Sequence, residues 1–105
     1  MSRLSNKTFL KQIKDAVCTV DPQADVYLFG SRARGDHRQY SDWDFLILTQ
    51  QPVTPSLKES IRNQLFYVEL SSGKIISTIV RTRSEWDEYE VTDLYQNIRE
   101  EGKRL

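Results

Sequence analysis

Apolar positions along the chain recur with two spacings, one typical of helices and one typical of strands. Over residues 6–20 they lie three or four positions apart, which predicts an amphipathic helix whose buried stripe is Phe9, Ile13, Ala16, Val17 and Val20. Ser5 or Asn6 can cap the start of this helix. Asp21-Pro22 ends it, because the residue before a proline disfavours the helical conformation.

Two strands and a short helix are predicted next. Residues 26–29 form a short apolar strand that Gly30 interrupts, and residues 31–34 are long enough for one turn of helix before Gly35. The run over residues 43–48 is almost continuously apolar. Such a run predicts a strand that is covered on both faces, as in an α/β sheet.

The second half of the chain predicts one long helix, one strand and two short helices. The long helix covers residues 55–70, with Thr54 as its cap and a proline in its first position. Residues 74–81, KIISTIVR, predict a third strand because they are rich in β-branched side chains. Ser84 is expected to cap the next helix, and the last helix covers residues 93–101. The predicted fold is α/β (α+β), a small mixed β-sheet packed with helices.

Composition limits what such a fold can do. With 105 residues, the chain is predicted to be a single domain over residues 1–105, and its single cysteine excludes an internal disulfide. No apolar run reaches the roughly 20 residues of a membrane span, and the charged N-terminus does not resemble a signal peptide, so a cytoplasmic protein without membrane contact is expected. Fifteen basic and 15 acidic residues balance, which disfavours long nucleic acid as a partner but allows a single nucleotide.

Candidate phosphate-binding residues lie just after the first predicted strand. Gly30 has no Cβ and lets phosphate oxygens approach the backbone, and the Ser31 hydroxyl adds a hydrogen-bond donor. Arg32 and Arg34 can pair with phosphate. Equally good interpretations are Arg32 in solvent and Arg34 in an ion pair with Asp42, Asp44 or Asp36. The segment lacks the Gly-Lys-Ser/Thr of a Walker loop, so a P-loop is excluded.

Candidate metal ligands lie at the start of the second strand. Asp42 and Asp44 are two positions apart, so in a strand their side chains point to the same face while Trp43 points to the other. Mg²⁺ is typically held by one or two carboxylates together with phosphate oxygens and water. The sequence therefore predicts a site for Mg²⁺ and a nucleoside triphosphate in the stretch from Gly30 to Asp44.

The same stretch, GSRARGDHRQYSDWD, carries the pattern G-S-x-A-R-G, a short spacer and S-D-x-D. It resembles the minimal nucleotidyltransferases of the DNA polymerase β superfamily. The resemblance implies that Gly30 and Ser31 bind the triphosphate of ATP or another NTP, and that Asp42 and Asp44 ligate Mg²⁺ as catalytic residues. It further implies transfer of a nucleoside monophosphate, AMP from ATP in the expected case, to an acceptor hydroxyl. Many small members are similar to antitoxins that are encoded beside a helical HEPN partner.

The chain departs from this family in one position. Active members carry a third carboxylate on a later strand, where it helps to bind metal and activates the acceptor. The equivalent residue here is Ser77, or Thr78 if the alignment shifts by one, and the acidic Glu69 is expected on a helix end instead. Two hypotheses follow, a Mg²⁺-dependent nucleotidyltransferase and a non-catalytic, nucleotide-binding or antitoxin-like interaction subunit.

Overall fold

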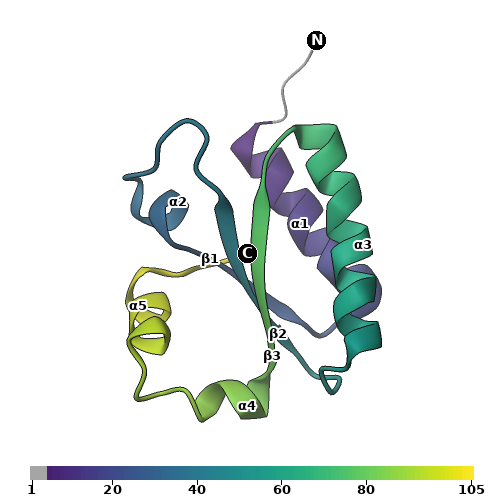
Figure 1. The fold of residues 1–105 in the computed structure, drawn as a ribbon, viewed down its shortest axis with the longest axis vertical. Coiled ribbons are helices and arrows are strands. Elements are labelled where there is room, and N and C mark those ends of the chain that lie inside the picture. The colour runs from purple at the N-terminus through teal and green to yellow at the C-terminus, as the bar shows by residue number, and fades with distance from the viewer. Residues whose placement is uncertain (1–4) are drawn as a thin grey trace.

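The computed structural model describes residues 5–105, so residues 1–4, at the start of the charged N-terminus, lie outside the described part. Nine elements follow one another within residues 5–105 (Figure 1). Their bounds are α1 (Asn6–Val20), β1 (Asp25–Phe29), α2 (Ser31–Arg34), β2 (Trp43–Thr49), α3 (Pro55–Ser72), β3 (Ile76–Thr82), α4 (Arg83–Asp87), α5 (Asp93–Glu101) and β4 (Lys103–Arg104). None of the helices within residues 5–105 is long and apolar enough to cross a membrane.

The four strands form one mixed sheet in the order β3-β2-β1-β4. β1 pairs antiparallel with β2 and with β4, whereas β2 and β3 run parallel. The parallel pair is connected through α3, as a parallel connection requires a crossover. The predicted α+β fold with a small mixed sheet is confirmed.

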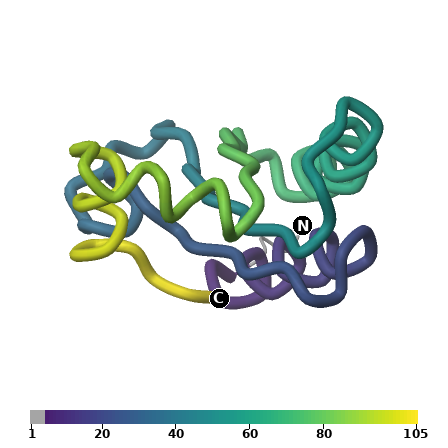
Figure 2. The backbone as a smooth tube through the Cα atoms, turned by 90° about the horizontal axis from the view of Figure 1, so that it is seen from below, coloured from purple at the N-terminus to yellow at the C-terminus, as the bar shows by residue number. Residues whose placement is uncertain are grey.

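Helices cover the two faces of the sheet unequally. α1 and α3 pack on one face, where Val26 and Leu28 of β1 and Phe45 and Ile47 of β2 are buried. On the other face lie α4 and α5 (Figures 1 and 2). Trp86, Tyr95 and Ile98 of these helices pack against the alternate residues of the same strands. β2 is therefore apolar at nearly every position because both of its faces are covered, as the sequence predicted.

Side-chain caps explain most of the helix boundaries. The Ser5 hydroxyl accepts the N–H of Thr8 at the start of α1, and the Thr54 hydroxyl accepts the N–H of Leu57 at the start of α3. The prediction that Ser84 caps α4 is wrong. Thr82 is the cap, because its hydroxyl accepts the N–H of Glu85 at 3.2 Å and the helix begins two residues earlier than expected.

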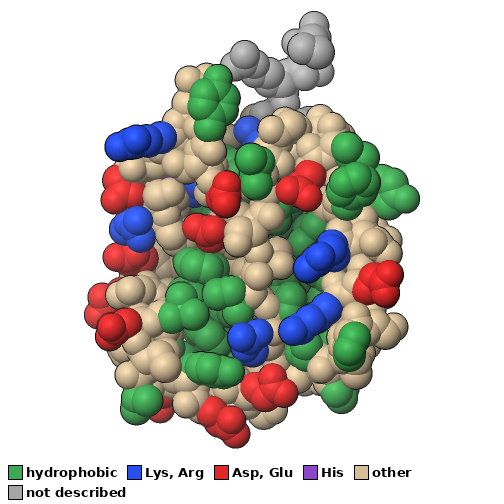
Figure 3. Space-filling model, in the orientation of Figure 1, with side chains coloured by type: hydrophobic (Ala, Val, Ile, Leu, Met, Phe, Trp, Pro, Cys, Tyr) green, Lys and Arg blue, Asp and Glu red, His purple; other side chains and the backbone are tan. Residues whose placement is uncertain are grey.

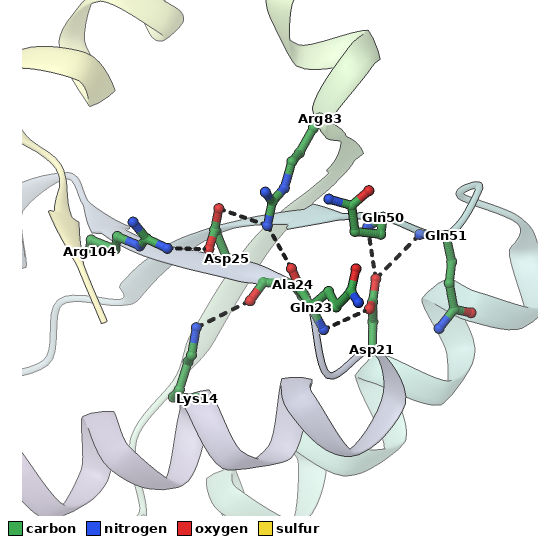
Figure 4. A network of polar contacts seen from close by, with 9 residues as sticks. All are labelled: Lys14, Asp21, Gln23, Ala24, Asp25, Gln50, Gln51, Arg83 and Arg104. Atoms are coloured by element: carbon green, nitrogen blue, oxygen red, sulfur yellow. Dashed lines mark hydrogen bonds and ion pairs between the residues drawn. The ribbon is translucent and has the colours of Figure 1, made fainter.

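Asp21 ties two turns together at one end of the sheet (Figure 4). Its buried carboxylate accepts the backbone N–H groups of Gln23 at 3.0 Å, Gln50 at 2.8 Å and Gln51 at 3.3 Å. The turn before β1 is thus bonded to the turn after β2. Because the two strands are antiparallel, this end of the sheet lies opposite the Gly30 end of β1.

Candidate active site

Gly30 ends β1 in a backbone conformation that other residues rarely adopt, with φ 75° and ψ −159°. Its carbonyl accepts the N–H groups of Ala33 and Arg34, both at 3.1 Å, so the turn of α2 closes directly on it. A Cβ at this position would collide with the Asp44 carboxylate. The absence of a side chain at Gly30 is therefore what allows the Gly-Ser turn to lie against an acidic group.

Asp44 lies near the start of β2, a central strand of the sheet, on the face that α1 and α3 do not cover. It pairs with Phe29 of β1 on one side and with Ser77 of β3 on the other. Trp43 points to the opposite face, where it is buried with its ring edge-on to Phe9 at 5.0 Å between centroids. Trp43 and Asp44 point to opposite faces as predicted, but β2 begins at Trp43, so the exposed Asp42 precedes the strand and its shared face with Asp44 stays a prediction.

The two carboxylates of Asp42 and Asp44 repel each other. The pKa of Asp44 is raised from its usual value, first by partial burial and then by the negative charge of Asp42, while Arg34 acts in the opposite direction. Among the described residues, no hydrogen bond or ion pair to the side chain of Asp42 or Asp44 is present. A bound cation would relieve this repulsion, and carboxylate oxygens are the ligands that Mg²⁺ prefers.

The two arginines of the predicted phosphate site have partners within the protein. The Arg32 guanidinium donates to the carbonyls of Gln39 at 3.0 Å and Ser41 at 3.1 Å and lies 4.5 Å from the centre of the Trp43 ring. Arg32 thereby connects α2 to the loop that leads to Asp42. It is held in this loop instead of extending into solvent.

Arg34 forms two ion pairs on the surface. Its guanidinium lies 3.1 Å from the Asp36 carboxylate and 3.3 Å from that of Glu101 at the end of α5. The pKa of Arg34 is raised by these two acidic groups, Asp36 foremost. The ion pair with Asp36 was one of the two interpretations of the sequence. Glu101 was not foreseen, because it is 67 positions away and no local pattern indicates such a contact.

Among the described residues, no third carboxylate joins Asp42 and Asp44. Ser77 is the direct neighbour of Asp44 on β3, so its side chain points to the same face, whereas Thr78 is paired with Phe45 and points away. The carboxylate of Glu69 accepts the backbone N–H of Ile76 at 3.0 Å and is engaged there. Within residues 5–105, no group of three or more His, Cys, Asp or Glu side chains is placed to hold a metal ion.

Comparison with known proteins agrees with this fold. The family model of the nucleotidyltransferase domain matches residues 10–105. The chain therefore belongs to the nucleotidyltransferase domain family. A search among curated proteins finds no match.

Solved structures with a similar fold come from toxin-antitoxin systems. A crystal structure of a toxin-antitoxin with AMP-PNP is similar with a TM-score of 0.65 and 19% identity, over 90% of this chain and 69% of that chain. Two mutant forms of the toxin-antitoxin MntA-HpeT have TM-scores of 0.61 and 0.60, with 18% and 21% identity. They cover 96% and 98% of this chain, and 72% of the other chain in both cases. At these identities the similarity shows the fold.

Proposed function

We propose that this protein binds a nucleoside triphosphate together with Mg²⁺ and transfers a nucleoside monophosphate, AMP from ATP in the expected case, to a hydroxyl of a partner protein. One observation carries the proposal. The Gly30 backbone lies so close to the Asp44 carboxylate that no Cβ fits between them. A turn suited to phosphate and a pair of carboxylates suited to a cation are thereby adjacent, as a metal-nucleotide complex requires.

Each group of the site has a role in this proposal. Gly30 and Ser31 would bind the triphosphate through backbone N–H groups and the Ser31 hydroxyl. Asp42 and Asp44 would hold Mg²⁺, which fits their mutual repulsion and their lack of partners among the described side chains. When bound, Mg²⁺ supplies positive charge that stabilises the phosphoryl group during transfer. Arg34 adds a positive charge whose effect reaches Asp44.

The reaction is an in-line displacement at the α-phosphorus. A bond forms between the acceptor oxygen and the α-phosphorus, and the bond from that phosphorus to pyrophosphate breaks. The proton of the acceptor hydroxyl must leave, and the position where the family carries a third carboxylate is occupied by Ser77 beside Asp44. Water or a side chain of the partner would accept this proton. Loss of a general base commonly lowers a rate by about 10²–10⁴-fold.

A second candidate function is favoured by Ser77. A chain that holds the nucleotide but lacks the base would act as a non-catalytic, antitoxin-like subunit. The fold neighbours are described as toxin-antitoxin structures, one of them with the ATP analogue AMP-PNP, which supports a protein partner and an adenine nucleotide for both candidates. We propose a helical partner of the HEPN type.

Label transfer separates the two candidates. The protein is incubated with α-labelled ATP, Mg²⁺ and the product of the neighbouring gene, and label is sought on that product. Transfer that disappears in Asp44→Asn supports the enzyme, whereas Mg²⁺-dependent ATP binding without any transfer supports the non-catalytic subunit. Ser77→Asp places an acid beside Asp44 and should raise transfer by about 10²-fold or more. Thr78→Asp is the matched control, because its side chain points to the other face.

A further inference from the structure

A small apolar cavity lies on the same face of the sheet as Asp44. Its volume is about 270 Å³. Its floor comes from β1 and β2 and its walls from α4 and α5, and the main lining residues are Tyr27, Leu46, Leu48, Trp86, Tyr95 and Ile98. In Figure 3, hydrophobic side chains gather over this part of the sheet, and acidic side chains border them.

The register of the strands places this cavity close to the candidate active site, on the same face of the sheet. Phe29 and Asp44 are paired across β1 and β2, and Tyr27 and Leu46 are the next pair on the same face. Two residues along a strand span about 7 Å. A group tethered to a phosphate at the Gly30 turn can therefore reach the cavity along the sheet.

The lining of the cavity suits a flat ring. The rings of Trp86 and Tyr95 pack on each other, with 5.1 Å between their centroids and 31° between their planes, so together they form an aromatic wall. Tyr27 contributes a third aromatic side chain from the sheet. Pockets for drug-sized ligands usually measure about 300–1,000 Å³, so this one is sized for a single ring system. Arg99 is the one charged lining residue among those described, and its guanidinium can donate hydrogen bonds to ring or carbonyl acceptors.

We propose that this cavity binds the base of the nucleotide whose phosphates lie at Gly30 and Asp44. The inference rests on the proposed function, because it needs the phosphates at that site. Any of the bases can stack on aromatic side chains, and this stacking contributes about 10- to 100-fold to affinity per base. The cavity would thus distinguish a nucleoside triphosphate from inorganic polyphosphate.

The test compares two ligands that share the phosphates and differ in the base. ATP and inorganic tripolyphosphate, each with Mg²⁺, are titrated into the full chain by calorimetry. ATP should bind about 10- to 100-fold more tightly. Tyr95→Ala should weaken ATP binding by about 10-fold and leave tripolyphosphate unchanged. Tyr89→Ala is the matched control, because Tyr89 packs on Trp86 at 5.8 Å without lining the cavity.

Tryptophan fluorescence gives a second measurement, whose main variant, Trp43→Phe, leaves the cavity unchanged. The chain has two tryptophans, and Trp43 is buried on the other face of the sheet. In Trp43→Phe, the emission of Trp86 should be quenched by ATP and not by tripolyphosphate. In Trp86→Phe, the remaining Trp43 should not distinguish the two ligands.

The outcomes separate failure of the inference from failure of the proposed function. Equal affinities for ATP and tripolyphosphate, with Trp86 unaffected by either, would overturn the base pocket and leave the phosphate site standing. Binding of neither ligand would overturn the proposed function and the pocket with it. If Tyr95→Ala loses tripolyphosphate as well, the variant has disturbed the fold, and selective quenching of Trp86 decides the question.

Discussion

The most direct test of the candidate site is to add a methyl group at Gly30. In Gly30→Ala, the added Cβ meets the Asp44 carboxylate and the backbone must keep a conformation with φ 75°. The strain of such a conformation is about 1–3 kcal/mol for a residue with a side chain. The carboxylate itself can rotate away, so the collision changes the position of Asp44 more than it changes stability.

Gly35→Ala is the matched control for this variant. Gly35 ends α2 with φ 86° and ψ 4°, and nothing lies within 4 Å of a Cβ placed there. Its strain is about 1–2 kcal/mol, since it adopts the left-handed conformation. For a domain of this size, 1 kcal/mol corresponds to a change in Tm of about 4–8 °C. Gly35→Ala should therefore lose about 4–16 °C in thermal unfolding, and Gly30→Ala should lose about 4–24 °C.

Binding should distinguish the two alanine variants. Displacement of the Asp44 carboxylate should weaken Mg²⁺-dependent ATP binding by about tenfold or more in Gly30→Ala, which is about 1.4 kcal/mol or more. Gly35→Ala should bind as the unmodified protein does. Both are measured by calorimetry at a temperature where each variant is folded. Unchanged ATP binding by Gly30→Ala would refute the reasoning, because the close approach of Gly30 and Asp44 would then have no functional consequence.

Three further perturbations test other parts of the structure. Asp44→Asn should raise the Tm of the metal-free protein at pH 7, because the pKa of Asp44 is higher in the folded state than in the unfolded state and the folded state loses stability as the pH rises through this pKa. The gain in Tm should vanish near pH 3, and scanning calorimetry that finds no gain at pH 7 contradicts the prediction. Arg32→Lys should lose the hydrogen bonds to the carbonyls of Gln39 and Ser41, which lowers the free energy of unfolding by about 1–2 kcal/mol and speeds proteolysis of the loop over 35–42. A loss of ATP affinity while the loop stays resistant to proteolysis would instead assign Arg32 to phosphate binding. Asp21→Ala should lower the free energy of unfolding by about 2–4 kcal/mol in urea titration, because three backbone N–H groups lose their acceptor, and it should leave ATP affinity unchanged at the far end of the strands.

Local patterns in the sequence were enough to predict most of the elements. Residues 6–20 form a helix as predicted because their apolar stripe and the Ser5 cap are both local features. The errors occur where two local signals compete. Thr82 and Ser84 can both cap a helix, and the position where β3 ends selects Thr82. The two-residue strand β4 carries no periodic signal, and it exists because α5 returns the chain to the edge of β1.

The sequence alone determined the order of elements, the opposite faces of Trp43 and Asp44, and the residues suited to phosphate and a cation, because these depend on neighbouring positions. Only the tertiary structure decided which groups meet. It placed Ser77 beside Asp44 through the register of β2 and β3, and it brought Glu101 to Arg34 across the fold. It also gathered the aromatic side chains of α4 and α5 over β1 and β2. Such contacts arise from the packing of distant segments, and no short pattern along the chain records them.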